Sequence, residues 1–189
     1  MPNWCNNSVT LRHKDPAMIE RVLKGKDGLL MEFMPTPQEL IDTVSGWMGE
    51  DKQAAHEAQQ ARNIEKYGFK DWYDWNVANW GTKWDVSLDS VERIDPNTVG
   101  ASFESAWAPP VVAYERLCEM GFEIKAYYDE PGMCFCGVVT GNEEFFDDDY
   151  REYSGESSET VREVIGEELD DYFAISENMA QWEEENEEE

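Results

Sequence analysis

Polar and apolar residues alternate in two segments of the chain, with the two-residue period of a strand that buries one face. The first segment is residues 99–107 and the second is residues 122–128. Residues 8–12 add a short run rich in β-branched side chains, and residues 133–140 return after a Glu-Pro-Gly turn. We therefore predict four strands, with residues 133–140 as the hairpin partner of residues 122–128.

Helical spacing of apolar residues follows two of these strands. An Asp-Pro pair at residues 15–16 supplies a cap and a first-turn residue for an amphipathic run over residues 18–23. A Pro-Pro pair precedes residues 111–120, whose apolar side chains share one helical face. Both segments predict helices, whereas the apolar run 29–33, which two prolines stop, is expected to be a further strand.

The predicted order is strand, helix, strand, insertion, strand, helix, strand, with one extra edge strand. This order is typical of the ferredoxin-like split βαβ arrangement, an antiparallel sheet with two helices on one face, so the fold class is α+β. Residues 38–84 are too long for a plain loop and form a Trp-rich insertion. Within it, residues 51–67 predict a helix that ends before Gly68.

The chain after residue 140 differs in character, so we divide it into a ferredoxin-like domain over residues 1–140 and an acidic extension over residues 141–189. The extension should begin with a linker. Residues 158–181 then predict one helix with apolar side chains on one side and carboxylates on the other. Residues 183–189 are almost entirely Glu, and we expect them to be solvated and disordered.

Net charge is the strongest indication of function in the sequence. The 189 residues include 42 Asp and Glu against 15 Lys and Arg, a formal net charge of −27. This balance argues against direct binding to nucleic acid or to an anionic membrane, because phosphate contacts need clustered basic residues. With 41% hydrophobic and 13% aromatic residues, the chain can still bury a core. Twenty acidic side chains but only two basic ones lie after residue 140.

Targeting signals and reactive motifs are missing from the sequence. No apolar run approaches the roughly 18 residues of a membrane span, and the N-terminus does not read as a signal peptide, so we expect a cytoplasmic protein. We find no phosphate loop, nucleophile elbow or paired His and Cys, and the four cysteines lack zinc-site spacing. We therefore predict no metal, no cofactor and no catalytic residues, although an enzyme without a named mechanism stays open.

A Trp-rich segment is the most unusual local feature. Four of the eight tryptophans lie within residues 71–85, and they could line a pocket that stacks a planar ligand. Alternatively, these aromatic side chains only attach the insertion to the sheet, and Lys83 and Asp85 form a structural ion pair. The candidate pocket residues are Trp4, Trp75, Asn79, Trp80, Lys83, Trp84, Asp85 and Trp107.

The acidic extension suggests a second candidate site. Its negative potential has the sign that DNA presents, so it could occupy the basic groove of a nucleic-acid-binding protein. Alternatively, the charge makes an acidic binding module without such a target, or serves solubility alone. The same carboxylates could hold a hard cation, although solvated faces explain them. The candidate partner-binding residues are Asp147, Asp148, Asp149, Glu163, Glu167, Glu168, Asp170 and Asp171.

Three blocks of sequence carry a resemblance to a known family. Residues 1–7 (MPNWCNN), 79–85 (NWGTKWD) and 103–110 (FESAWAPP), followed by residues 127–137, resemble the YubB-type ferredoxin-like domain family of bacteriophages and conjugative plasmids. The resemblance covers residues 1–140 and leaves the acidic extension outside. It implies the ferredoxin-like fold and a mobile-element origin inside a bacterial cell, but it brings no activity or site residues.

Together, charge and resemblance give the functional hypothesis. We expect an accessory protein that binds a basic, nucleic-acid-binding host protein and inhibits it, as a DNA mimic in an anti-defence or host-takeover role. The expected partner is therefore that basic host protein, and we expect no direct contact of this chain with nucleic acid or membrane. The alternative is a small-ligand-binding protein or enzyme that uses the Trp-rich pocket around residues 79–85.

Overall fold

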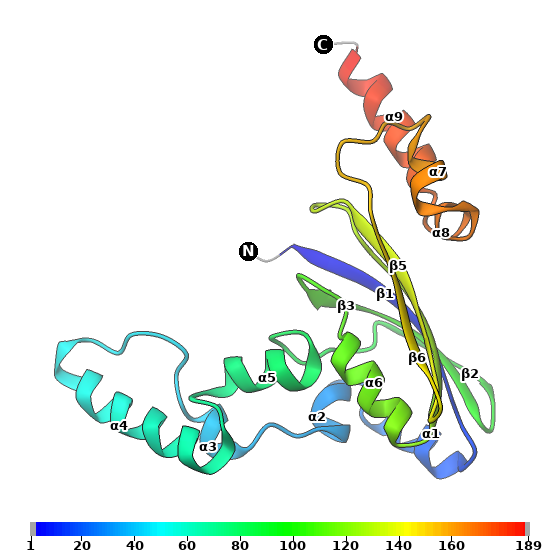
Figure 1. Ribbon diagram of the computed structural model, residues 1–189. Coiled ribbons are helices and arrows are strands. Elements are labelled where there is room, and N and C mark those ends of the chain that lie inside the picture. Colours follow the sequence, from blue (N-terminus) through cyan, green and yellow to red (C-terminus); the bar gives the residue numbers. More distant parts are fainter. Residues whose placement is uncertain (1–2, 188–189) are drawn as a thin grey trace.

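The computed structural model describes residues 3–187 and contains a six-stranded antiparallel sheet with the order β2-β3-β1-β4-β5-β6 (Figure 1). This sheet confirms the α+β, ferredoxin-like fold class. The strands are β1 (Trp4–His13), β2 (Ser90–Asp95), β3 (Thr98–Ala106), β4 (Phe122–Glu130), β5 (Phe135–Gly141) and β6 (Phe146–Glu152).

The ferredoxin-like unit is formed by β1, α1 (Pro16–Lys24), β2, β3, α6 (Val111–Glu119) and β4. The four strands predicted from the sequence and the two helices are confirmed. The strand expected over residues 29–33 is wrong, because this segment forms α2 (Leu29–Phe33). The Asp85 carboxylate fixes its start by accepting hydrogen bonds from the backbone N–H groups of Leu30 (2.8 Å) and Met31 (3.2 Å). The true second strand is β2, an exposed edge strand.

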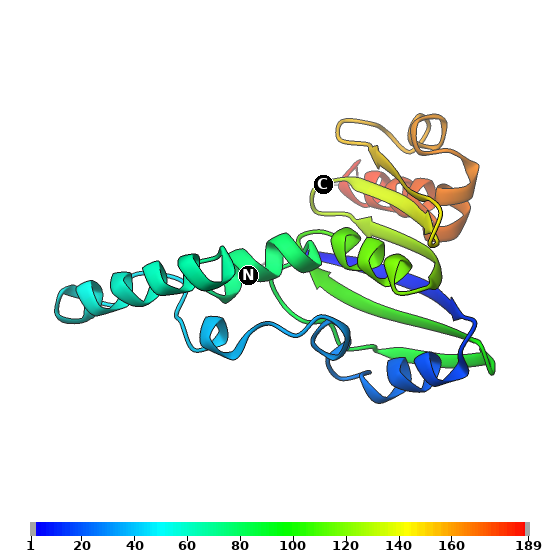
Figure 2. The same ribbon diagram turned by 60° about the horizontal axis from the view of Figure 1, so that its bottom comes forward.

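One face of the sheet carries the main core. Val9 lies at the centre of the sheet, opposite Ala101 on β3 and Ala126 on β4. Side chains on this face pack against α1, α2, α6 and the Trp80 indole of α5 (Trp72–Trp80). Figure 2 shows these helices along one side of the sheet. The apolar positions of the alternating strand segments are therefore the residues that form this core.

The rest of the insertion stands away from the sheet. It consists of α3 (Gln38–Ile41) and α4 (Glu50–Tyr67), and α4 projects from the body of the molecule (Figure 2). The helix predicted over residues 51–67 is thus confirmed. Its single buried residue is Asn63, whose amide donates hydrogen bonds to Thr43 Oγ1 (2.9 Å) and to the Lys70 carbonyl (2.8 Å). A polar contact, not an apolar stripe, fixes the end of α4.

The sheet continues past the boundary expected at residue 140. In place of the expected linker, β6 pairs with β5, so that Asp148 lies opposite Val139. The single helix expected over residues 158–181 is three helices, α7 (Val161–Ile165), α8 (Glu167–Phe173) and α9 (Ile175–Glu187). The chain breaks at Gly166 and Ala174, which have φ values of +84° and +53°. The Glu-rich end is helical as far as residue 187, and residues 188–189 lie outside the described part.

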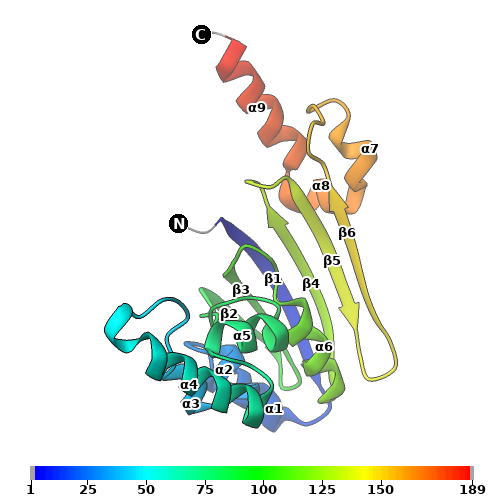
Figure 3. The same cartoon turned by 60° about the vertical axis from the view of Figure 1, so that its left-hand side comes forward.

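Helices α7 and α8 pack on the opposite face of the sheet, and α9 packs against them and runs past the ends of β4 and β5 (Figures 1 and 3). Their core is a second apolar cluster that joins Cys136 of β5 to Val161, Ile165 and Leu169. At its edge the rings of Tyr127 and Tyr172 stack with centroids 4.0 Å apart. The C-terminal segment is therefore docked on the sheet by its own core.

Packing of the sheet can be tested at Gly137, because Tyr128 of β4 and the backbone of β6 fill the space that a side chain here would need. A Cβ atom at Gly137 would lie 2.3 Å from the Tyr128 hydroxyl and 2.7 Å from the Asp149 carbonyl oxygen. Tyr128 is fully buried and cannot move aside. We expect Gly137→Ala to lower the free energy of unfolding by about 2 kcal/mol or more in urea titrations. Gly100→Ala is the control, since its Cβ would be 3.6 Å from Ile94; equal effects would contradict the prediction.

Candidate functional site

Half of the candidate pocket residues are parts of the scaffold. Trp80 is 2% exposed, and its indole N–H donates a hydrogen bond to the Met34 carbonyl (3.0 Å). Trp75 packs edge-on against it, with ring centroids 5.8 Å apart. The Asn79 side-chain oxygen accepts a hydrogen bond from Arg116 of α6 (2.9 Å). These contacts hold α5 against the sheet helices and occupy the polar groups of Trp80 and Asn79.

Asp85 also has a structural role. Besides the two N–H groups of α2, its carboxylate accepts a hydrogen bond from the Val86 N–H (2.8 Å). Burial raises the pKa of Asp85, while the three backbone donors oppose that shift. The carboxylate is therefore occupied by backbone groups, and the expected ion pair with Lys83 is replaced by this helix cap.

The other four candidates meet at the surface. Lys83 Nζ lies 3.8 Å from the centroid of the Trp84 ring and 3.9 Å from that of Trp107. Trp4 extends the group, with its ring centroid 5.9 Å from that of Trp84. All three tryptophans are more than two-fifths exposed. We call these four residues the aromatic patch; it presents π surfaces around one cation.

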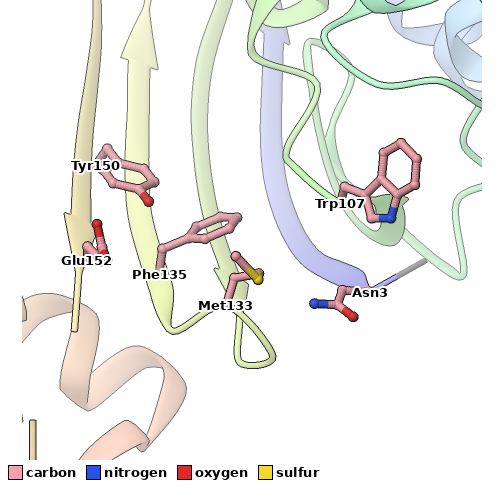
Figure 4. Close-up of a pocket in the computed structure, with 6 residues that line it drawn as sticks. All are labelled: Asn3, Trp107, Met133, Phe135, Tyr150 and Glu152. Carbon is pink, nitrogen blue, oxygen red and sulfur yellow. The ribbon is translucent and has the colours of Figure 1, made fainter. Parts of the chain in front are cut away.

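A groove of about 500 Å³ continues the aromatic patch at the edge of the main core, on the face of the sheet that carries α1, α2 and α6 (Figure 4). Trp107 lies on one side, and Phe135 and Tyr150 lie opposite, with their own centroids 5.3 Å apart. Sequence reasoning missed every lining residue except Trp107, because the register of β6 brings several of them together. The lining residues are Asn3, Trp107, Met133, Phe135, Tyr150 and Glu152.

The backbone of Trp107 is strained. Its φ of +71° lies in the left-handed region, which bulky residues rarely adopt. The Trp107 N–H donates a hydrogen bond to the Asn3 carbonyl (2.9 Å), and this contact holds the turn after β3 against the start of β1. Such strain costs of order 1–3 kcal/mol and is concentrated at functional sites. Here it places a large exposed indole at the mouth of the groove.

The candidate acidic residues on β6 do not form one cluster. Successive strand residues point to opposite faces, so Asp148 is separated from Asp147 and Asp149. The Tyr128 hydroxyl donates a hydrogen bond to Asp148 (2.7 Å), and burial raises the pKa of that carboxyl. Asp149 pairs with Arg151 (2.7 Å). The run of three aspartates is therefore divided between two surfaces.

The helical candidates surround two cations. Arg162 Nη1 lies 2.7 Å from both Asp170 and Asp171, and Glu167 is 3.9 Å from the same guanidinium. Glu168 pairs with Lys125 of β4 (2.9 Å). Glu163 is exposed. Four of these carboxylates thus have partners within the chain, but Arg162 is outnumbered by the acids around it.

Asp170 is the buried member of this group. Its side chain accepts hydrogen bonds from the N–H (2.8 Å) and hydroxyl (2.7 Å) of Ser176, at the start of α9. Burial opposes its ionisation, but the hydrogen bonds from Ser176 and Arg162 outweigh that effect and lower the pKa of Asp170. Asp170 therefore fixes the junction of α8 and α9, while Glu163, Glu167 and Asp171 remain at the surface.

The elements β6, α7, α8 and α9 together form what we call the acidic lobe, residues 146–187. Its two basic residues are Arg151 and Arg162, and both are paired with carboxylates of the same lobe. No other basic side chain of the lobe is available to neutralise its remaining acids. The lobe therefore presents an anionic surface on ordered helices.

A second cavity, of about 460 Å³, lies between α9 and the end of β4, with Asp129 in its wall. Asp129 is 8% exposed, and its Oδ1 atom accepts a hydrogen bond from the Tyr153 hydroxyl (3.0 Å). Burial raises the pKa of Asp129 to about 6, the Tyr153 hydrogen bond opposes the shift, and neighbouring Glu130 adds to it. Sequence reasoning missed this residue, which lacks any distinguishing motif.

The fold defines a ferredoxin-like domain enlarged by β5, β6 and a second helical layer. Residues 79–188 match the family described as the ferredoxin-like domain in Api92-like proteins, and the chain belongs to this family. The match includes the acidic lobe, which the sequence resemblance had left outside. The crystal structure of protein api92 from Yersinia pseudotuberculosis is similar over 82% of this chain and 99% of that one, with 12% identity and a TM-score of 0.48. No curated protein matches the chain.

Two further findings concern residues 3–187. They contain no group of three or more His, Cys, Asp or Glu side chains arranged to hold a metal ion. Likewise, no helix within this range is both long and apolar enough to cross a membrane.

The raised pKa of Asp129 predicts a pH dependence of stability. Its carboxyl binds a proton more tightly in the folded state than in the unfolded state, so its burial penalty is present above pH 6 and is relieved as the pH falls toward 4. We expect Asp129→Asn to raise the free energy of unfolding at pH 7.5 by about 1–3 kcal/mol and to flatten its rise between pH 7.5 and 5.

The control for this prediction is Asp89→Asn, which removes the same charge from an exposed position. Urea titrations at several pH values compare the two variants with the unmodified protein. The same pH profile for both variants would show that general charge repulsion, and not burial of Asp129, sets the pH dependence.

Proposed function

We propose that the protein binds a basic, nucleic-acid-binding protein through the acidic lobe and inhibits it by occupying the surface that would contact nucleic acid. The observation that carries the proposal is the fixed anionic surface: the carboxylates stand on ordered helices, and the two arginines of the lobe are already paired. A rigid array of negative charges attracts a basic groove and raises the rate of association with it.

The order of the lobe supports mimicry more than mere solubility. Exposed charges on a disordered tail would also keep the protein soluble, but they would not hold fixed positions. Here Asp170 anchors α9, and the second apolar cluster docks α7 and α8 on the sheet. The exposed Glu163, Glu167, Asp171 and Glu177 are therefore presented by a folded scaffold.

The sequence resemblance supplies the biological setting of the proposal. Proteins of the YubB type are carried by bacteriophages and conjugative plasmids, which enter cells that contain nucleases and other DNA-binding enzymes. An inhibitor carried by such an element would act in the cytoplasm of the bacterial host, in an anti-defence or host-takeover role. The partner is thus proposed to be a host protein.

Neutralisation of the lobe tests this function. The variant Glu163→Gln, Glu167→Gln, Asp171→Asn and Glu177→Gln removes four exposed charges and spares Asp170. We expect the immobilised protein to capture basic DNA-binding proteins from bacterial lysate, with release by duplex DNA or by salt well above about 0.15 M. Quantitative mass spectrometry should show a loss of capture of about tenfold in the variant.

The matched control neutralises four acidic residues of α4, which lies outside the acidic lobe: Glu50, Asp51, Glu57 and Glu65. It changes the net charge by the same amount as the lobe variant. This control should retain the captured proteins. Equal loss in both variants would reduce the effect to net charge, and the absence of any basic DNA-binding protein among the captured species would refute the proposed function.

The aromatic patch and its groove favour a second candidate function, binding of a planar small ligand. The supporting observation is Trp107, whose strained backbone holds an exposed indole between Lys83 and the groove. Stacking between aromatic rings would give affinity, and Lys83 would pair with an anionic group such as a phosphate. A nucleotide has both features.

Trp107→Gly tests this candidate without adding strain, because glycine accepts the positive φ. Titration with nucleotides, followed by the NMR signals of the indole N–H groups, should shift the signals of Trp4, Trp84 and Trp107. The variant should bind at least about tenfold more weakly, as the loss of a stacking partner implies. Trp47→Ala, at an exposed indole on the insertion, is the control. Unshifted signals in the unmodified protein would exclude this function.

A further inference from the structure

The cavity beside Asp129 combines apolar walls with buried acid. It lies where the turn between β4 and β5, the end of β6 and the helix α9 meet. Its volume of about 460 Å³ exceeds what one extended side chain requires. The residues that define its character are Asp129, Tyr153, Glu156, Ile175, Met179 and Trp182.

Helix α9 supplies the apolar wall. Ile175, Met179 and Trp182 are spaced by four and three residues, so they share one face of the helix. Ile175 is buried, Met179 is half-buried and Trp182 is 65% exposed. The wall therefore runs from a buried apolar end to an indole at the surface, which suits a ligand with an apolar stem.

Asp129 gives the cavity its charge. The Tyr153 hydroxyl donates to the Oδ1 atom, whereas Oδ2 accepts no hydrogen bond from residues 3–187. Glu156 also lines the cavity, and the carboxylate of Glu183 is held by the N–H (3.0 Å) and hydroxyl of Ser158. Within the described residues, no Lys or Arg side chain lines the cavity. The largely buried Asp129 thus keeps one carboxylate oxygen without a donor from the described residues, and this oxygen is accessible from the cavity.

We propose that this cavity binds a Lys or Arg side chain of another protein, with its cationic end at Asp129 and its stem along Ile175 and Met179. The Trp182 ring then covers the cation or its stem at the mouth. The inference rests on the proposed function, since it makes the basic partner the source of this side chain. It adds a specific anchoring pocket to the general attraction of the acidic lobe.

Other classes of ligand fit the cavity less well. An anion would be repelled by Asp129 and Glu156, and a neutral apolar ligand would leave the buried carboxylate without a donor. A divalent cation needs several oxygen ligands, and the side chains here do not form a metal-binding group within the described residues. A monovalent cation on an apolar stem meets both the charge and the walls of the cavity.

The exposed carboxylates of the lobe and the anchoring pocket would contribute differently to the interface. Exposed carboxylates of the lobe steer a basic partner but contribute modest energy in salt. A charged side chain that is desolvated in a pocket is the kind of contact that dominates binding energy. Since Tyr153 follows β6 directly and α9 belongs to the lobe, the pocket lies at the lobe's own margin.

Model side chains test the pocket directly. The full-length protein is titrated with Nα-acetyl-lysine amide and Nα-acetyl-arginine amide, and separately with the uncharged Nα-acetyl-norleucine amide and Nα-acetyl-citrulline amide. We expect saturable shifts of the Ile175 and Met179 methyl signals with the two cations only. Binding should weaken at least about tenfold in Asp129→Asn, because the variant lacks the charge, and also weaken in Trp182→Ala.

Two matched variants control the experiment. Asp89→Asn changes the net charge as Asp129→Asn does, and Trp47→Ala removes another exposed indole. Both should bind the cations like the unmodified protein. Equal binding of charged and uncharged probes, unchanged binding in Asp129→Asn, or no saturable shift with either cation would overturn the inference.

The outcome is separable from that of the proposed function. Saturable binding of the cations, together with failure to capture a basic protein, would support the pocket and refute the proposed inhibitor. Capture that depends on the lobe but is unaffected by Asp129→Asn would support the inhibitor and overturn the anchoring pocket.

Discussion

The structure depends on burial of both faces of β4 and β5. Tyr128 and Phe135 point into the main core, whereas Tyr127 and Cys136 point to the second apolar cluster. Strand alternation makes the two faces inseparable, because a shift of one residue would exchange every side chain between them. The ferredoxin-like unit and the acidic lobe are thus locked to each other through two shared strands. This arrangement explains how the acidic lobe, with sixteen carboxylates, stays ordered: apolar contacts beneath it offset the repulsion above.

Cations and carboxylates have different structural roles in this protein. The few cations of the sheet and lobe, such as Lys125 and Arg162, tie the helices down and leave the outer carboxylates exposed. Asp129 is different, because its burial raises its pKa and opposes folding at neutral pH. Groups that reduce stability in this way are found at functional sites, where binding supplies the missing partner. The buried acid and the anionic surface therefore support the same proposal, that the protein binds a positively charged partner.

Sequence patterns predicted those strands in which buried and exposed residues alternate. β1, β3 and β4 each bury one face in the main core, the Asp15 cap marked α1, and the Pro-Pro pair marked the start of α6. The patterns failed where distant residues decide, since Asp85 makes residues 29–33 helical from 55 positions away. Edge strands β2 and β6 carry charges on both faces and so lack a period. For the candidate sites, the sequence singled out Trp4, Lys83, Trp84 and Trp107, which lie together at the surface. The groove required the register of β6, and nothing local distinguishes Asp129.

The acidic residues of β6 also affect how the edge of the sheet can pair with another chain. An outermost strand offers its unused backbone N–H and C=O groups to any passing chain, which invites fibril growth. On β6, Asp147, Asp149 and Arg151 line one face of that margin, and Asp148 and Glu152 line the other. A second copy approaching in register would bring aspartate against aspartate, and electrostatic repulsion would oppose the pairing. These charged side chains thus act as gatekeepers that oppose templated aggregation at this edge of the sheet.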